Sequence, residues 1–305
     1  MIKKIELHLH LDGSIREETA NEILGKKCNL KAKDKCEDLN EYLEKFEIPS
    51  LILQTKENLE RIAYELALDL KKDNVIYAEI RFAPLKHINK GLSLDDVIDA
   101  VLNGLSKVDI ETNLILCMMR NDNFDDNKKV IDLAHKYGFA IDLAGAEAIY
   151  KTKDFKELFE YAKSLNIPFT IHAGEADGYD SIKAAIDFGA TRLGHGIKII
   201  DYPDLIEEAK FKNVTLEVCP TSNVQTNAVN KLCDHPIKKL YDMKLNVCIN
   251  TDNRTVSDVT LEEEYQKLKE TFHFNDEDFI RMNEIAIDAS FAKDKEKLKT
   301  KLRGE

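Results

Sequence analysis

Short apolar or β-branched runs alternate with longer amphipathic stretches along most of the chain. Within the longer stretches, apolar residues recur at spacings of three and four, which is typical of a helix that buries one face. The short runs have the length and composition of buried strands. Strands that alternate with helices in this way favour a parallel sheet whose strands are joined by crossover helices.

Eight strands are expected, and this number favours a closed (β/α)8 TIM barrel over an open sheet, which more often has about five or six strands. The sixth run is weak by β propensity, so the count depends partly on spacing. The predicted strands span residues 4–9, 75–81, 114–119, 139–143, 168–171, 192–194, 214–218 and 245–249. The predicted helices between them include residues 52–70, 94–105, 130–137 and 155–165.

Two segments are longer than a barrel needs. Residues 14–74 exceed one crossover helix, so we expect extra helices after the first strand, near residues 16–25 and 38–46, packed over the mouth of the barrel. Residues 261–302 predict two or three further helices at the C-terminus, and the last dozen residues, rich in lysine and glutamate, are expected to fray. Because no interdomain linker interrupts the pattern, residues 1–305 are expected to form a single barrel domain.

The composition supports a domain of this size and narrows the class of ligand. The chain has 305 residues, of which 43% are hydrophobic, and an α/β barrel commonly uses about 250 residues. Lysine and arginine number 44 against 56 acidic residues, which gives a net charge of −12. Nucleic-acid binders normally carry a basic surface, so neither a nucleic acid nor an anionic membrane is expected as a partner. A small neutral or cationic substrate fits better.

The cysteines and the N-terminal residues favour a cytoplasmic location. The six cysteines form no Cys-x-x-Cys pair, which is typical of reduced thiols in a cytosolic enzyme. Lys3 and Lys4 are not followed by an uninterrupted apolar core, so a signal peptide is not expected. No run approaches the roughly 18 apolar residues of a membrane span. Nothing in the sequence indicates an obligate protein partner.

Polar residues gather where the predicted strands end, and this is where a (β/α)8 barrel carries its chemistry. Histidines stand at three of these ends, which is far from a random distribution of the eight histidines in the chain. The segments are HLHLD at residues 8–12, HAGE at 172–175, HG at 195–196 and NTDN at 250–253.

His8 and His10 are two residues apart, so on a strand they point to the same face, roughly 6–7 Å from each other. Two imidazoles placed in this way inside a barrel can share one metal ion. With His172 and Asp252 from other strands, three nitrogens and one carboxylate oxygen suit Zn²⁺ with a water at an open position. The same ligands would also accept cobalt or iron.

Other residues that could bind a metal ion are less suitable. A surface or core-edge position is expected for the remaining histidines, His87, His135, His235 and His273. Cys219 and Cys248 are expected to be small buried side chains. The end of the fourth strand, residues 142–145, carries no lysine that could be carboxylated to bridge two metal ions, so one ion is expected.

Together these segments resemble the adenosine deaminase family of the amidohydrolase superfamily. The resemblance runs from residue 4 to about residue 265, in the order and spacing of the family. It is carried by HLHLDGS at residues 8–14, HAGE at 172–175, LGHG at 193–196 and NTDN at 250–253, with further similarity in DLAGAE at 142–147 and CPTSN at 219–223. It implies zinc-dependent hydrolytic deamination of adenosine, and of 2′-deoxyadenosine, to inosine and ammonia in purine salvage, with one Zn²⁺ per chain.

The resemblance also implies roles for individual residues. The metal ligands would be His8, His10, His172 and Asp252. The catalytic residues would be Glu175, as the proton donor to purine N1, and His195, which would orient and polarise the attacking hydroxide. The substrate-binding residues would be Gly145 at purine N3, Asp12 at a ribose hydroxyl, His10 and Asn253.

The chemistry of deamination accounts for these residue types. Attack at C6 moves electrons onto N1, and a protonated carboxyl there neutralises the charge as it develops. Glu175 must therefore hold a proton near pH 7, and burial raises the pKa of an acid. His195 and the metal ion would stabilise the attacking oxygen electrostatically.

Asn253 departs from the family, which commonly has a second aspartate at this position. That aspartate contacts purine N7, which is a hydrogen-bond acceptor. A carboxylate needs a proton to donate there, whereas an amide donates directly. We therefore expect Asn253 to keep the contact with N7.

Several alternatives stay open on sequence alone. Adenine deaminases of this family tend to have glutamate where Asp12 stands, so a nucleoside is favoured over free adenine. A nucleoside modified at the 5′ position, such as methylthioadenosine, is another candidate substrate. AMP is less favoured, because no basic phosphate cluster stands out.

Activities of other classes fit the residues less well. An inactive binding protein would be expected to lose Glu175 or His195, and both are present. A phosphatase or esterase on the same barrel would usually recruit a second metal ion. The deaminases with His/Cys/Cys zinc ligands carry a P-C-x-x-C segment, which this chain lacks.

Overall fold

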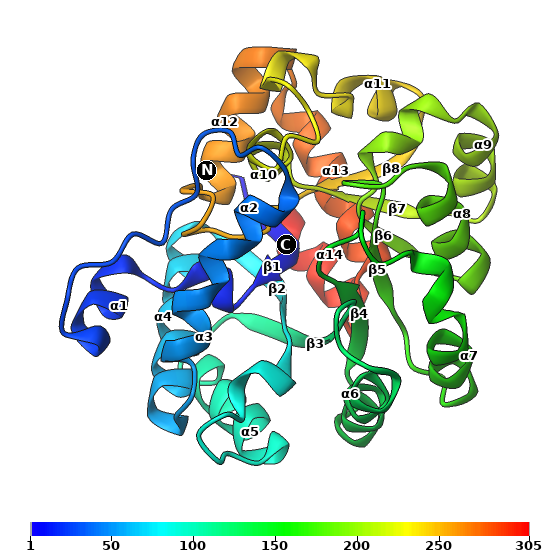
Figure 1. Cartoon of the computed structure of the whole chain (residues 1–305). Coiled ribbons are helices and arrows are strands. Elements are labelled where there is room, and N and C mark those ends of the chain that lie inside the picture. Colours follow the sequence, from blue (N-terminus) through cyan, green and yellow to red (C-terminus); the bar gives the residue numbers. More distant parts are fainter. Residues whose placement is uncertain (1, 305) are drawn as a thin grey trace.

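The computed structural model describes residues 2–304, and it shows a barrel of parallel strands surrounded by helices (Figure 1). Four strands pair in sequence order, β1 (Lys4–His10), β2 (Val75–Phe82), β3 (Glu111–Met119) and β4 (Ala140–Ala144). A second group pairs in the same way, β5 (Thr170–Ala173), β6 (Arg192–His195), β7 (Thr215–Val218) and β8 (Asn246–Ile249). Bridges between Ile141 and Phe169 and between Leu9 and Asp252 join the two groups. The expected (β/α)8 barrel is confirmed.

Helices cover the outside of the barrel (Figure 1). Between the strands lie α4 (Lys56–Lys72), α5 (Leu94–Leu105), α6 (Phe124–Tyr137), α7 (Lys156–Ser164), α8 (Tyr179–Phe188), α9 (Pro203–Phe211), α10 (Pro220–Gln225) and α11 (Ile237–Asp242). Short 3-10 turns are η1 (Asp12–Ser14), η2 (Glu44–Phe46), η3 (Pro84–His87), η4 (Thr152–Phe155), η5 (Ile197–Asp201) and η6 (Leu232–Asp234). Thr55, Ser93 and Asn123 accept backbone hydrogen bonds at the starts of α4, α5 and α6, and such caps fix where a helix begins. Among residues 2–304, no helix has both the length and the apolar character needed to cross a membrane.

The extra helices after β1 lie in two places. Residues of α2 (Leu39–Leu43) and η2 line the cavity at the mouth of the barrel, as expected. The neighbouring α3 (Glu47–Ile52) contributes Ser50 to the same cavity. In contrast, α1 (Glu17–Leu24) lies at the side of the barrel against α4, where Arg61 pairs with Glu22, so its expected place over the mouth was wrong (Figure 1).

The C-terminal segment forms three helices, α12 (Leu261–Phe272), α13 (Asp276–Ala289) and α14 (Lys295–Arg303). The expected fraying of the last dozen residues was wrong. Asp294 caps the start of α14, and Leu298 is buried against α13 and the outer face of β1, which stabilises this helix. Helix α6 also begins earlier than the expected residue 130, because Asn123 caps it.

The interior of the barrel is polar, although (β/α)8 barrels are usually filled by branched apolar side chains. Strand residues alternate between two faces, so Leu9 and Phe82 pack outward under the helices. The residues that alternate with these along each strand point into the barrel. Arg81, Asp142 and Glu217 are fully buried there, and Arg81 forms an ion pair with each of the two carboxylates. The same alternation therefore builds the apolar layer and brings charged groups to the barrel axis.

Glu264 on α12 connects the C-terminal helices to the segment after β7. Its Oε1 accepts a hydrogen bond from the backbone N–H of Thr221 in α10, 3.0 Å away, and its Oε2 has no hydrogen-bond partner. Burial raises the pKa of Glu264 to about 7, although the charge of Lys267 opposes this shift. The folded protein therefore favours the protonated carboxyl.

We predict that Glu264→Gln removes a pH-dependent loss of stability. Because the pKa is raised on folding, the wild type gains stability from this proton below about pH 4.5 and loses it as the pH rises through about 7. The free energy of unfolding of the variant, relative to that of the wild type, should therefore rise by on the order of 3 kcal/mol from pH 4 to pH 8. Urea unfolding at both pH values measures this, with the exposed Glu270→Gln on the same helix as control. An equal difference at both pH values would refute the prediction.

Candidate active site

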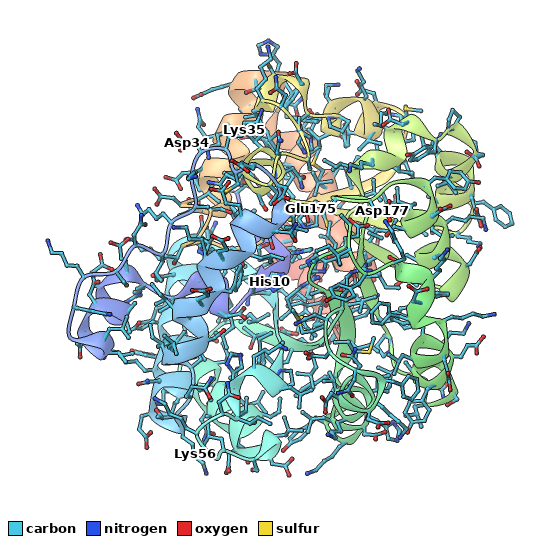
Figure 2. All side chains as sticks on the ribbon, in the orientation of Figure 1. His10, Asp34, Lys35, Lys56, Glu175 and Asp177 are labelled. Carbon is cyan, nitrogen blue, oxygen red and sulfur yellow. The ribbon has the colours of Figure 1, made fainter. Side chains whose placement is uncertain are left out.

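A cavity of about 390 Å³ opens at the carboxyl ends of the strands. This volume lies within the range of about 300–1,000 Å³ that small-molecule sites usually have. Figure 2 shows His10 and Glu175 toward the middle of the molecule, whereas Lys35 and Lys56 lie at its outer edge. The residues that line the cavity follow β1, β4, β5, β6 and β8, with one wall from α2 and η2.

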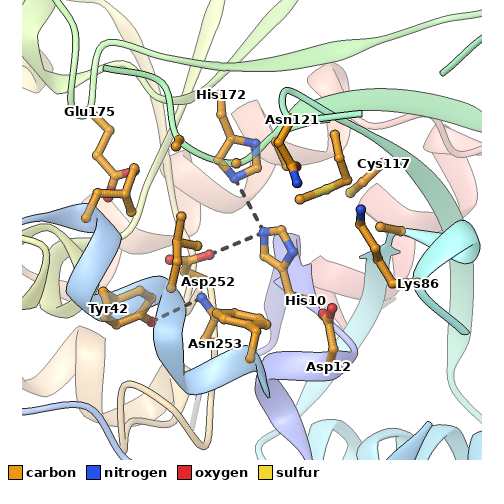
Figure 3. A pocket seen from close by; sticks show the side chains of 18 of the residues that line it. His10, Asp12, Tyr42, Lys86, Cys117, Asn121, His172, Glu175, Asp252 and Asn253 are labelled. Carbon is orange, nitrogen blue, oxygen red and sulfur yellow. Dashed lines mark hydrogen bonds and ion pairs between the residues drawn. The ribbon is translucent and has the colours of Figure 1, made fainter. Parts of the chain in front are cut away.

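Three of the four predicted metal ligands, His10, His172 and Asp252, line this cavity (Figure 3), and the fourth, His8, is fully buried beside Asp252. Oδ1 of Asp252 is 3.3 Å from Nε2 of His8 and 3.4 Å from Nε2 of His10. Nε2 of His10 is also 3.4 Å from Nε2 of His172. A fifth side chain, His195, belongs to the same group, because its ligand atom and those of His8, His172 and Asp252 all lie within 4.8 Å of one another.

The donor atoms of this group suit a divalent cation. Nδ1 of His8 donates a hydrogen bond to Oε2 of Glu217 at 2.8 Å, so the lone pair of His8 is on Nε2, which has no hydrogen-bond partner of its own. Nδ1 of His172 lies 2.8 Å from Oδ2 of Asp142 in an ion pair, and this carboxylate favours a proton on Nδ1 and a lone pair on Nε2. Carboxylates behind histidine ligands are the usual arrangement in metal sites. The residues present therefore fit a bound metal ion.

Two of these side chains are held by unusual backbone conformations. His195 has φ 62° and Asp252 has φ 61°, both in the left-handed region that side chains other than glycine rarely adopt. Such residues cost about 1–3 kcal/mol each and cluster at functional sites. Hydrogen bonds from the Asp252 N–H to His8 and from the His10 N–H to Asp252 hold the second of them at the seam between β8 and β1. Oγ of Ser222 donates to Oδ2 of Asp252 at 2.6 Å, which fixes its carboxylate.

Glu175 lies in the loop after β5, beside the metal-binding group. Oγ1 of Thr226 donates to its Oε1 at 2.9 Å, and its Oε2 is 3.5 Å from Nε2 of His195. Burial raises the pKa of Glu175 to about 7, and the negative charge of Asp252 adds to this shift. The carboxyl can therefore carry a proton near neutral pH, as the expected chemistry requires.

The predicted substrate-binding residues all line the same cavity. Figure 3 shows Asp12 and Glu175 on opposite sides of His10 and Asp252, so a ligand can touch both ends at once. Burial raises the pKa of Asp12 to about 6. Gly145 has φ 104°, which favours glycine at this wall of the cavity.

Arg81 stands at the end of the predicted second strand, and no role was expected for it. Its guanidinium donates to Oδ2 of Asp142 at 2.9 Å and to Oε2 of Glu217 at 2.8 Å. These are the two oxygens that face His172 and His8. A polar residue between Ile80 and Phe82 in a buried strand was the signal in the sequence, because it must point into the barrel.

Glu147 is a second residue whose role was not predicted from its sequence context. Its carboxylate accepts hydrogen bonds from four consecutive backbone N–H groups of the loop that carries Glu175, those of residues 174–177, at 2.7–3.1 Å. Oγ of Ser181 donates to it as well, at 2.5 Å. The loop is therefore fixed by one buried side chain from the segment after β4.

The remaining histidines and the cysteines include both exposed and buried side chains. His135 and His273 are exposed, as expected, but His87 and His235 are buried, so a surface or core-edge position was wrong for these two. No local pattern indicates that the segments carrying them fold inward. Cys219 and Cys248 are small buried side chains as expected, and all six cysteines lie within the described residues as free thiols.

Fold and site together define a metal-dependent hydrolase built on a (β/α)8 barrel. The chain belongs to the adenosine deaminase family, because the family model described as adenosine deaminase matches residues 3–303. An adenosine deaminase of Clostridium perfringens is 40% identical over 99% of this chain and 97% of its own. An adenosine deaminase of Enterococcus faecalis is 39% identical over 97% of this chain and 94% of its own.

Solved structures agree with this fold. An adenine deaminase from Arthrobacter aurescens superposes with a TM-score of 0.91 at 25% identity, over 100% of this chain and 99% of its own. The N6-methyl-AMP deaminase from Arabidopsis thaliana superposes with a TM-score of 0.85 at 25% identity, over 99% and 95% of the two chains. The family resemblance found in the sequence is confirmed.

We predict that Arg81→Lys weakens binding of Zn²⁺ by about 10–100-fold, because an ammonium cannot contact both carboxylates with the fork of a guanidinium. A chromogenic chelator that competes for the ion measures the affinity. Arg192→Lys is the matched control, since Arg192 is equally buried and pairs with Glu79 and with the other oxygen of Glu217, Oε1, which does not face His8. Equal zinc affinities of the wild type and R81K would contradict the prediction.

We also predict that Glu147→Gln lowers both stability and turnover. The amide lacks the charge and one acceptor oxygen, so buried N–H groups of the loop lose their partners, at a cost of about 1–3 kcal/mol for each. We expect a lower urea midpoint and a fall in deamination kcat of at least about tenfold, since a displaced Glu175 no longer meets the substrate. Glu157→Gln, on the exposed side of α7, is the control. Unchanged turnover in E147Q would exclude a positioning role.

Proposed function

We propose that this chain removes the 6-amino group of adenosine, and of 2′-deoxyadenosine, by hydrolysis to inosine and ammonia, with one Zn²⁺ per chain. The observation that carries the proposal is Glu175, a buried carboxyl that can hold a proton near neutral pH, next to a group of metal donors in a cavity of nucleoside size. Membership of the adenosine deaminase family supports the substrate. A role in purine salvage in the cytoplasm follows from this reaction.

The cavity suits a flat base with a ribose attached. Its apolar lining comes from Leu43 and Phe46 in the extra helices after β1, and from Ala83, Met119 and Ala144 at the ends of β2, β3 and β4. With N1 of the purine at Glu175, the ribose extends toward Asp12 at the far end of the cavity. Gly145 then lies beside the edge of the base that carries N3.

His8, His10, His172 and Asp252 would hold the metal ion. Three imidazole nitrogens and one carboxylate oxygen are ligands that favour zinc. When bound, zinc lowers the pKa of water to about 7 and so supplies hydroxide at neutral pH. His195, which contacts Glu175 rather than a ligand carboxylate, is left to interact with the attacking oxygen.

Glu175 acts on the ring. Attack at C6 breaks the aromatic system and pushes electrons onto N1, where the protonated carboxyl gives up its proton. The carboxylate that results is adjacent to His195 and to Thr226, which stabilise it until a proton returns. The departing amino group takes up a proton and leaves as ammonia, so water and adenosine balance inosine and ammonia.

The experiment compares adenosine, 2′-deoxyadenosine, adenine, AMP and N6-methyl-AMP as substrates of the zinc-loaded protein. Turnover is followed by the loss of ultraviolet absorbance and by the release of ammonia, or of methylamine from N6-methyl-AMP. We expect turnover of the two nucleosides and loss of that turnover in Glu175→Gln. Preference for adenine, the substrate named for the Arthrobacter aurescens structure, would overturn the assignment of a nucleoside. A protein that binds zinc and turns over none of them would be a binding protein.

Asn253 gives a further prediction. Its Nδ2 donates to the hydroxyl of Tyr42 at 3.1 Å, which leaves a second N–H for purine N7. Asn253→Ala should raise KM for adenosine or lower kcat, together by about 10-fold or more in kcat/KM, as a lost hydrogen bond to a buried acceptor implies. Tyr42→Phe is the control, because it keeps the amide of Asn253 and removes only the hydroxyl group next to it. Unchanged kinetics of N253A would remove Asn253 from the site.

A further inference from the structure

A chain of hydrogen bonds runs from the backbone of α11 to the active-site imidazole of His195. The N–H of Ile237 donates to Nδ1 of His235 at 3.1 Å. Nε2 of His235 is 3.2 Å from Oδ1 of Asn223, and Nδ2 of Asn223 is 2.9 Å from Nδ1 of His195. His235 is 3% exposed, His195 1% and Asn223 not at all, so bulk water does not compete for these bonds.

The direction of every bond in this chain follows from its first member. A backbone N–H can only donate, so Nδ1 of His235 accepts, and a neutral ring then carries its proton on Nε2. That N–H donates to Asn223, so the amide atom that faces it is the oxygen. The amide nitrogen of Asn223 therefore faces Nδ1 of His195 and donates to it.

The ring of His195 consequently carries its proton on Nε2, the nitrogen that faces the cavity. A protonated ring nitrogen has no lone pair for a metal ion, but it can donate a hydrogen bond. His8 and His172 have the opposite tautomer, because their Nδ1 atoms face carboxylates and their Nε2 atoms face the metal-binding group. The difference in tautomer separates His195 from the histidines that it touches.

We propose that Asn223 and His235 are positioning residues that fix His195 as its Nε2–H tautomer. This tautomer keeps His195 out of the coordination of the metal ion and makes it a hydrogen-bond donor to the oxygen that attacks C6. The catalytic consequence rests on the proposed deaminase function, whereas the tautomer is a property of the protein alone. Burial lowers the pKa of His235 to about 3, which is consistent with a neutral ring at the head of the chain.

Asn223→Asp is the variant that tests the chain directly. A carboxylate accepts the hydrogen bond of His235 as the amide oxygen does, and it has nearly the same size. Toward His195 it can only accept, so it requires a proton on Nδ1. Both hydrogen bonds are kept and only the direction of one is reversed, which separates the role of the tautomer from a loss of packing.

The first measurement is the ¹⁵N NMR spectrum of the His195 ring in the metal-free protein, where protonated and unprotonated ring nitrogens have distinct shifts. We expect a proton on Nε2 and none on Nδ1 in the wild type, and a proton on Nδ1 in N223D. His235→Gln should keep the wild-type pattern, because its amide can accept from Ile237 and donate to Asn223. A wild type with the proton on Nδ1, or a variant with an unchanged spectrum, would overturn the proposal.

The second measurement is the kinetics of adenosine deamination by the zinc-loaded proteins. We expect kcat of N223D to fall on the order of 100-fold, the usual effect of losing one donor to a developing charge, with little change in KM. Asn227→Asp, an exposed position in the same segment, adds the same charge and should have no effect. Wild-type kcat in N223D would overturn the catalytic consequence, whereas a wild type that deaminates no adenosine would instead overturn the proposed function and leave the NMR result standing.

Discussion

The contacts of Arg81 with Asp142 and Glu217 are the interaction on which the rest of the site depends. Two carboxylates inside a barrel would lose far more solvation than a protein can tolerate if they were unpaired. Burial by itself would raise the pKa of Asp142 and of Glu217, but Arg81 and the neighbouring histidines outweigh it and hold both pKa values well below their ordinary range. Both groups therefore stay ionised, and each can hold a histidine with its proton turned away from the metal ion.

The position of every important proton in the site is set by a partner outside it. Carboxylates on the barrel axis place the protons of His8 and His172, and the amide of Asn223 places that of His195. Burial keeps a proton on Glu175 near neutral pH, while Glu147 fixes the loop that carries it. Four titratable groups, those of His8, His172, His195 and Glu175, thus acquire their protonation states from the residues around them.

Much of this could be predicted from the sequence, because it depends on local patterns. All eight strands follow from apolar runs, and the end of a strand marks a site residue such as His172 or Asp252 without any knowledge of the fold's details. The roles of Arg81 and Glu147 depend on contacts across 61 and 28 residues, and no local pattern encodes which partners they meet. His235 was placed wrongly for the same reason, since only the folded chain brings it under Asn223.

The errors in predicting three of the helices have simpler causes. The polar first turn of α6 concealed its start, because the cap at Asn123 and not an apolar spacing defines it. The lysines of α14 suggested a solvated tail, yet the buried Leu298 and the partly buried Leu302 dock that helix against the barrel. Helix α1 lies beside α4, with which Arg16 and Glu22 form ion pairs, and sequence spacing does not reveal these long-range partners.

The central claim is that four side chains share one metal ion while His195 stays outside its coordination. A crystal structure of the zinc-loaded protein tests it most directly. The account predicts a single ion about 2.0–2.2 Å from Nε2 of His8, His10 and His172 and from a carboxylate oxygen of Asp252, with Nε2 of His195 beyond bonding distance. An ion bonded to His195, or one that leaves His10 or Asp252 unbound, would contradict it.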